Sequence, residues 1–247
     1  MKKTILKVLP FLLVSLSFLF SCMYLGKSWL NSKKQHLGIS VTGLSSKDFV
    51  SDLVTWNASF TRKDMNMQSA FAQLKKDAET VKAWLVEHNI KLEEIVFSAV
   101  DMSKEFDYVP VGTGNQTRQQ FAGYSLRQTV TIESKNLEKV ITASREVTGL
   151  IEQGLELSSN APDFYYTKLS DLKIEMLAQA TKDGRIRAEQ IAKNAGNGLG
   201  KLKSADMGIF QITGRNSNEN YSWGGTFNTS NKDKTATITV KLEFEID

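Results

Sequence analysis

The sequence predicts an α+β fold, in which antiparallel or mixed sheets are covered by long amphipathic helices, after one N-terminal hydrophobic helix. Apolar residues recur at helical spacing in three long stretches and alternate with polar residues in several shorter ones. The alternation is one-sided, which is typical of strands that bury a single face under helices. A chain of 247 residues, 41% of them hydrophobic, can also bury one good core. The order of these strands and helices further predicts two similar halves.

The first element is a run of apolar and small residues from Val8 to Gly26. At about 1.5 Å per residue, a helix of this length spans about 28 Å, which is enough to cross the hydrocarbon core of a membrane. Residues 1–35 are therefore expected to form an anchor or signal segment with a tether, and residues 36–247 the folded domain. The predicted membrane segment includes Val8, Leu9, Phe11, Leu12, Leu13, Val14, Leu16, Phe18, Leu19 and Phe20.

Three kinds of leader fit this run to different degrees. A retained signal anchor fits its length and the lysines Lys27, Lys33 and Lys34 that follow it. A lipoprotein signal fits Cys22 loosely, since a lipid-modified cysteine follows a small residue such as Ser21. Simple cleavage fits least, because no small-residue cleavage site follows the run. We expect a single-pass membrane anchor with the folded domain exported to the periplasm, and a lipoprotein as the alternative.

The first part of the folded domain reads as strand, strand, helix and strand. A short strand is expected at His36–Gly43, and Val50–Phe60 alternates apolar and polar residues as a second strand does. Apolar residues from Met67 to His88 then step by four and three, which predicts an amphipathic helix that Asn89 ends. Ile95–Ala99 resumes as a strand.

The middle of the chain begins with a loop at Val109–Gln120, which is rich in glycine and polar residues. A strand through Tyr124–Ile132 and an amphipathic helix through Leu137–Ile151 follow. A break at Asn160–Pro162 precedes a short strand at Phe164–Tyr166.

The longest helix is predicted from Ser170, as its cap, to a stop at Gly196, Asn197 and Gly198. Its predicted inner face is mostly small, which would let the helix lie close to what it covers. That face consists of Ile174, Leu177, Thr181, Gly184, Ala188, Ile191 and Ala195. Strands are expected at Met207–Thr213 and Ala236–Ile246. The long polar loop between them, at Gly214–Lys234, carries Tyr221 and Trp223.

Several of these segments resemble the SIMPL domain family. The segment from Arg187 to Lys193, with Gly196 and the Leu199–Leu202 turn, is similar to the family's signature helix and the turn that follows it. Phe121–Val130 and Phe164–Tyr166 resemble two of its strands, and the resemblance covers about residues 37–247. The family includes bacterial periplasmic and outer-membrane immunogenic proteins and an oxidative stress defence protein, and no general catalytic residues are established for it. Some relatives form large rings, so the resemblance implies a homo-oligomer.

The charge and the reactive residues exclude several classes of function. Six lysines precede His36, and the remaining 25 basic residues stand against 27 acidic ones, a net charge of −2, so nucleic-acid binding is not expected. With Cys22 as the only cysteine and two histidines, no metal or cofactor site is predicted. Gly196, Gly198 and Gly200 follow a helix C-terminus, which is the wrong pole for phosphate binding.

The expected function is therefore non-enzymatic. We expect a membrane-tethered, self-assembling SIMPL-domain protein of the bacterial cell envelope with a structural or stress-protective role. The alternative is an envelope module that binds glycan or peptide through the 214–234 loop, with Tyr221 and Trp223 as ligand or subunit contacts; its small-molecule ligand is unknown. A hydrolase that uses carboxylates such as Asp101 and Glu105 ranks third, because surface carboxylates are usually solvated.

Overall fold

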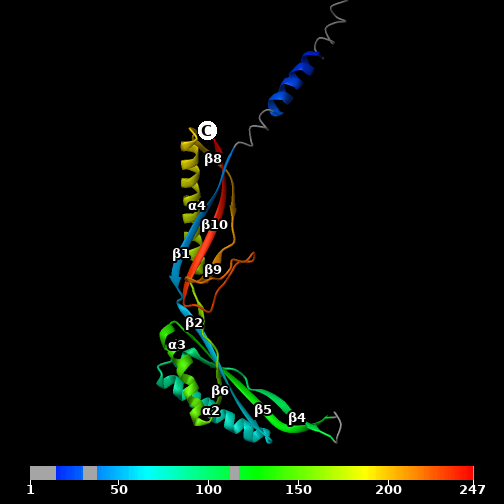
Figure 1. Cartoon of the computed structure of the whole chain (residues 1–247), viewed down its shortest axis with the longest axis vertical. Coiled ribbons are helices and arrows are strands. Elements are labelled where there is room, and N and C mark those ends of the chain that lie inside the picture. The colour runs from blue at the N-terminus through cyan, green and yellow to red at the C-terminus, as the bar shows by residue number, and fades with distance from the viewer. Residues whose placement is uncertain (1–14, 30–37, 112–116, 247) are drawn as a thin grey trace, which may run out of the picture. The chain divides into compact units, whose positions relative to one another are not determined.

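The computed structural model describes residues 15–29, 38–111 and 117–246. It is an α+β protein with antiparallel sheets, as predicted (Figure 1). The folded chain divides into two compact units. The first comprises the described residues up to 45 together with 175–209 and 238–246, and the second comprises residues 46–174 and 210–237. Two similar halves are not confirmed.

The second unit contains a six-stranded sheet with the strand order β3-β5-β2-β6. β2 (Leu53–Asp64) pairs antiparallel with β5 (Thr117–Ser134), and both are long. β3 (Ile95–Phe97) and β4 (Asp101–Pro110) also pair with β5, whereas β6 (Glu156–Ser159) and β7 (Asp163–Tyr165) pair with β2. The register sets the inward residues of β2, which are Val54, Trp56, Ala58 and Phe60.

Two helices bury their apolar faces in this core. α2 (Met67–Glu87) has the predicted bounds: the side chain of Asn66 accepts hydrogen bonds from the first turn, and Asn89, at φ 62°, follows its C-terminal end. Leu74, Val81 and Leu85 of α2 are buried in the core. α3 (Leu137–Glu146) continues as a 3₁₀ segment to Gln153, so the predicted helix at 137–151 is an α-helix followed by a 3₁₀ helix.

Three predicted boundaries differ from the structure. β1 (Gly38–Val50) ends where one strand was expected to begin, because Ser51 and Asp52 turn the chain before β2; Val50 is 53% exposed instead of buried. At the predicted loop at 109–120, β4 extends to Pro110 and β5 begins at Thr117, and residues 112–116 lie outside the described residues. The strand expected at 207–213 is two strands, β8 (Leu199–Met207) and β9 (Gln211–Gly214).

In the first unit, one sheet has the strand order β1-β10-β8 and is covered by α4 (Leu169–Asn194). β10 (Asp233–Ile246) pairs antiparallel with β8 in this unit, whereas residues 234–237 of β10, which belong to the second unit, pair antiparallel with β9. The alternate residues of β10 are buried as predicted up to Phe244, whereas Ile246, predicted on the same face, is 36% exposed. The buried ones are Ala236, Ile238, Val240, Leu242 and Phe244.

The predicted inner face of α4 is wrong in part. Ile174 and Ile191 are 71% and 49% exposed, and Gly184 and Ala188 are the members of the predicted face that are buried. The buried residues instead recur at every fourth position, at Leu172, Met176, Ala180, Gly184, Ala188 and Ala192. Such a row slopes across the helix axis, and a twisted sheet favours a sloping contact. Ser170 lies inside the helix instead of capping it, whereas Gly196, at φ 79°, follows its end as predicted.

Candidate functional site

Residues 214–234, called here the aromatic loop, connect β9 to β10 in the second unit (Figure 1). Both aromatic residues predicted as contacts are exposed: Tyr221 by 64% and Trp223 by 96%. The Tyr221 hydroxyl donates a hydrogen bond of 3.4 Å to Oγ1 of Thr237, whereas the Trp223 side chain is almost entirely in solvent. The loop thus presents a tryptophan, the largest of the apolar side chains, with almost its whole surface in solvent.

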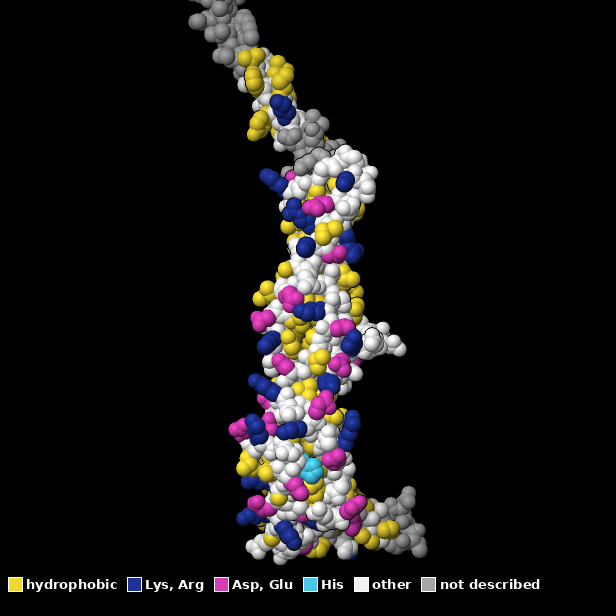
Figure 2. Space-filling view, turned by 90° about the vertical axis from the view of Figure 1, so that its left-hand side faces the viewer, with side chains coloured by type: hydrophobic (Ala, Val, Ile, Leu, Met, Phe, Trp, Pro, Cys, Tyr) yellow, Lys and Arg dark blue, Asp and Glu magenta, His cyan; other side chains and the backbone are white. Residues whose placement is uncertain are grey.

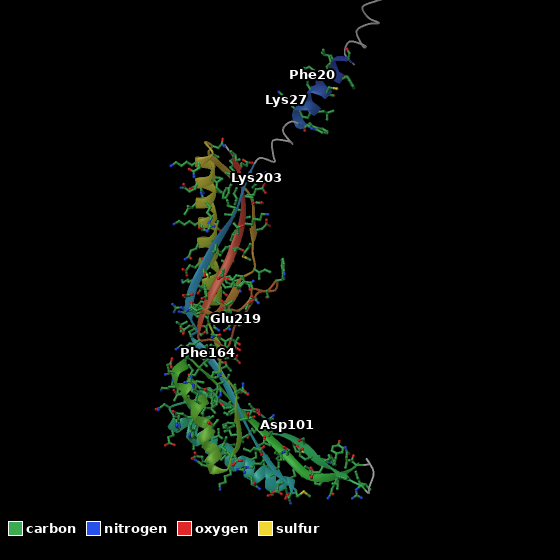
Figure 3. All side chains as sticks on the ribbon, in the orientation of Figure 1. Phe20, Lys27, Asp101, Phe164, Lys203 and Glu219 are labelled. Atoms are coloured by element: carbon green, nitrogen blue, oxygen red, sulfur yellow. The ribbon has the colours of Figure 1, made fainter. Side chains whose placement is uncertain are left out.

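Glu219, labelled in Figure 3, accepts hydrogen bonds from three other residues of the aromatic loop. Its carboxylate accepts a hydrogen bond of 2.8 Å from the Gly214 amide and one of 3.3 Å from the Ser217 hydroxyl. It also accepts a hydrogen bond from the side-chain amide of Asn228. These bonds, first of all that from Gly214, stabilise the charged form and lower the pKa of Glu219. The carboxylate therefore serves to fix the loop.

Lys234 holds the same loop through hydrogen bonds to Asn228. Its side chain is 2% exposed, and its ammonium group donates hydrogen bonds to the backbone carbonyl of Asn228 and, at 3.3 Å, to the side-chain oxygen of Asn228. Burial lowers the pKa of Lys234 to about 8, against the attraction of Glu219 and Asp163. The same side-chain oxygen of Asn228 accepts a hydrogen bond of 3.0 Å from the Asn231 amide. The buried amine is thus committed to holding the loop's return segment.

A second set of hydrogen bonds holds the residues on either side of Trp223. The side chain of Gln211 on β9 donates to the Ser222 carbonyl at 2.9 Å and accepts from the Thr226 amide at 2.6 Å. Gly225, at φ 92°, makes the turn between them in a conformation that favours glycine. Trp223 is therefore exposed on a loop whose flanks are fixed, so that contact with a partner would cost little entropy for ordering the backbone there.

The chemistry of this site suits binding through an aromatic surface. The carboxylate of Glu219 and the amine of Lys234 are both used by the loop's own hydrogen bonds. Across the ranges 15–29, 38–111 and 117–246, no group of three or more His, Cys, Asp or Glu side chains is arranged to hold a metal ion.

The predicted membrane residues fall into two sets. Leu16, Phe18, Leu19 and Phe20 lie on a helix at residues 15–29 and are exposed, and hydrophobic side chains cover much of that helix (Figure 2). Val8, Leu9, Phe11, Leu12, Leu13 and Val14 lie outside the described residues, as does the predicted boundary at residues 35–36. Within the described part of the chain, no helix is both long and apolar enough to cross a membrane. Cys22 is exposed on the same helix at 15–29.

Sequence reasoning missed Lys234 and Gln211 as parts of the site. A signal for Lys234 was present, because it has the same parity as Ala236 and Ile238 on the inward face of β10. When the alternation of buried residues in β10 is extended from Ala236 by one step toward the N-terminus, it places Lys234 on the buried face.

The family model SIMPL, described as a protein of unknown function (DUF541), matches residues 39–245. The matched segment runs from β1 to the end of β10 and includes the aromatic loop. No curated protein matches the chain.

Proposed function

This chain belongs to the SIMPL family, and from that premise we propose that it is a membrane-tethered, non-enzymatic protein of the bacterial cell envelope that assembles with copies of itself. Its role is structural or stress-protective. The observation that carries the proposal is Trp223, 96% exposed on a braced loop. Tryptophan is enriched among the residues that dominate the energy of protein–protein interfaces.

The non-enzymatic part of the proposal is supported by the use of the loop's polar groups. Glu219 and Lys234 brace the loop that carries Trp223 instead of facing a common open space. The membrane tether is supported by the apolar run at residues 8–26 and by the exposed apolar side chains of the helix at 15–29, with Lys27 near its end (Figure 3). As a single-pass anchor, this segment would place the folded domain in the periplasm. In the alternative, the protein is a lipoprotein and Cys22 carries the lipid.

Sedimentation equilibrium of the full-length chain in density-matched detergent tests the assembly. We expect a mass of two or more chains, and we expect Trp223→Ala to weaken assembly at least tenfold. Trp29→Ala is the matched control, because Trp29 is 70% exposed but lies on the N-terminal helix. A wild-type chain that stays monomeric at high concentration would refute the proposal.

A second candidate function is the binding of envelope glycan or peptide by the aromatic loop. The fixed Tyr221 hydroxyl favours it, because a ring held by Thr237 and a neighbouring exposed indole could both stack on a ligand. The double variant Tyr221→Ala/Trp223→Ala should then lose binding to envelope glycan and peptide fractions while it keeps its circular dichroism spectrum. Unchanged binding would remove this candidate.

A further inference from the structure

β4 and the N-terminal part of β5 continue beyond the rest of the sheet as a two-stranded ribbon. β2 pairs with β5 only as far as Asp64 opposite Tyr124, whereas β4 pairs with β5 from Asp101 opposite Arg127 to Pro110 opposite Thr117. We call β4 with residues 117–127 of β5 the ribbon; residues 124–127 are still paired with β2, and residues 117–123 continue beyond it with β4 alone. The ribbon extends past the start of α2 in Figure 1, where it is green. A two-stranded ribbon is at best marginally stable in water without something packed on its apolar face.

The register gives the ribbon one apolar and one charged face. Met102 lies opposite Leu126, and Phe106 lies opposite Phe121. The Phe121 ring makes edge contacts with those of Phe106 and Tyr124, with centroids 5.9 and 5.2 Å apart. The other face pairs charged and polar residues. It includes Asp101, Ser103, Glu105 and Asp107 of β4, with Gln120, Ser125 and Arg127 of β5.

The apolar face leads into a groove beside the first turns of α2. The groove has a volume of about 380 Å³ and is lined by Met67, Gln68, Phe71, Val100, Met102 and Leu126. Phe71, Met102 and Phe106 are each about half exposed, at 50%, 47% and 47%. With Met67 and Tyr108, which are 44% and 66% exposed, they leave on the order of 500 Å² of large apolar side chain in solvent. That area approaches the roughly 800 Å² that each partner buries in a standard interface.

The charges of β4 argue against pairing of two ribbons edge to edge in the registers centred on residues 103–107, near the middle of the strand. When two identical strands pair antiparallel about a two-fold axis, one central residue lies opposite its own copy. A residue a given number of positions before the centre then lies opposite the residue the same number of positions after it. A centre at Lys104, Glu105 or Asp107 places that charge opposite its own copy. A centre at Ser103 places Asp101 opposite Glu105, and a centre at Phe106 places Glu105 opposite Asp107. Each of these registers sets like charges directly opposite, which is destabilising.

We propose that the apolar face of the ribbon, together with the groove, docks on the same face of a second copy of this chain. An apolar face is complementary to itself, so a two-fold, face-to-face contact buries it on both copies at once. Lys104 is the charged side chain on this face, and its apolar stem lets the ammonium group reach the rim. The inference rests on the proposed self-assembly and supplies a surface for it other than Trp223.

The test compares charges placed on the two faces of the same strand in the full-length chain. Phe106→Glu introduces a charge in the apolar face, and Val109→Glu introduces it on the opposite face, where Val109 is 38% exposed. By sedimentation equilibrium, we expect Phe106→Glu to raise the dissociation constant at least tenfold and Val109→Glu to change it less than twofold. A monomeric wild type would refute the proposed self-assembly itself. A wild type that assembles and is unaffected by Phe106→Glu, or weakened equally by both variants, would overturn this inference alone.

Cross-linking identifies the occupant of the face. In a Cys22→Ser background, Lys104→Cys should give a covalent dimer with a short bis-maleimide, whereas Ser103→Cys, on the charged face, should give little. Absence of the dimer from Lys104→Cys, with a polarity-sensitive dye at that cysteine responding only to added lipid vesicles, would assign the face to lipid and overturn the inference.

Discussion

Gly43 of β1 and Gly184 of α4 lie backbone against backbone, with no side chain between them. A Cβ atom on Gly43 would come within 2.0 Å of the Ala180 carbonyl oxygen and 2.6 Å of the Gly184 nitrogen. A Cβ atom on Gly184 would meet the end of the Leu242 side chain at 2.7 Å and the Gly43 Cα at 3.3 Å. The helix thus crosses the strand at a point where neither glycine has room for a side chain. The obstacle to a Cβ atom on Gly43 is rigid backbone, whereas the nearest obstacle to a Cβ atom on Gly184 is the flexible end of the Leu242 side chain.

We therefore predict opposite tolerance at the two glycines. Gly43→Ala should destabilise the first unit by about 3 kcal/mol or more, because the obstacle is backbone. Gly184→Ala should cost less than about 1.5 kcal/mol, since Leu242 can move and alanine gains about 1 kcal/mol of helix propensity. Hydrogen exchange of the α4 amides measures both. Gly149→Ala, which meets nothing within 4 Å, is the control, and equal effects at Gly43 and Gly184 would contradict the prediction.

The ion pair between Arg62 and Asp77 should behave as a buried pair. Nε and Nη2 of the Arg62 guanidinium both donate to the Asp77 carboxylate, and the Nη2 bond measures 2.8 Å. Asp77 is 4% exposed on the inner face of α2. Arg62→Met leaves this carboxylate buried without its partner and should cost about 3–5 kcal/mol.

The double variant Arg62→Met/Asp77→Leu should recover most of that loss, because it buries no charge. Urea unfolding followed by the fluorescence of Trp56, which is fully buried in the same core, gives the free energies. A double variant no more stable than Arg62→Met would show that the charge itself does not cause the loss.

Lys234 should make stability rise with pH in alkaline solution. Its pKa is about 8 in the folded protein and 10.5 in an exposed lysine. Between these values the unfolded chain holds a proton that the folded chain has released, so the free energy of unfolding increases with pH. Below pH 8 both states are protonated, and the cost of burying the charge is constant.

The matched variant is Lys234→Met, which has no amine to titrate. The free energy of unfolding of the wild type minus that of Lys234→Met should be flat from pH 6 to pH 7 and should increase from about pH 8 to pH 10. A constant difference across the whole range would mean that the amine is not penalised by burial.

The leader can be assigned through Cys22. For a retained anchor, we expect a radiolabelled fatty-acid precursor not to label the chain, and we expect Cys22→Ser to stay in the alkali-washed membrane fraction. Incorporation of label that Cys22→Ser abolishes would establish the lipoprotein instead. Solubility of the wild type after the wash would contradict both kinds of tether.

The sequence predicted elements best where burial and local capping agree. α2 has its predicted start because Asn66 caps an apolar period that the core uses, and β10 alternates because one of its faces is buried. β4 was missed since both of its faces are largely exposed and Lys104 interrupts the apolar series. The inner face of α4 was misplaced because Ala180 and Ala192 carry little hydropathy signal, although close approach to the sheet buries them.

The candidate site was predictable in its exposed part only. Tyr221 and Trp223 stand out in a polar segment, and their exposure follows from its composition. The hydrogen bonds that fix the segment run from Gln211 to Ser222 and from Asn228 to Glu219, and they depend on tertiary geometry that spacing along the chain does not encode.

The acidic residues of β4 have a consequence for the newly made chain. Before the apolar face of the ribbon is buried, the unpaired edge of β4 can form hydrogen bonds with other extended chains, and such pairing promotes insoluble aggregates. We expect Asp101, Glu105 and Asp107 to act as gatekeepers against that route, as charged residues beside aggregation-prone strands do in other proteins. Neutral amides at these three positions would leave the native contacts of the core intact and still lower the soluble yield.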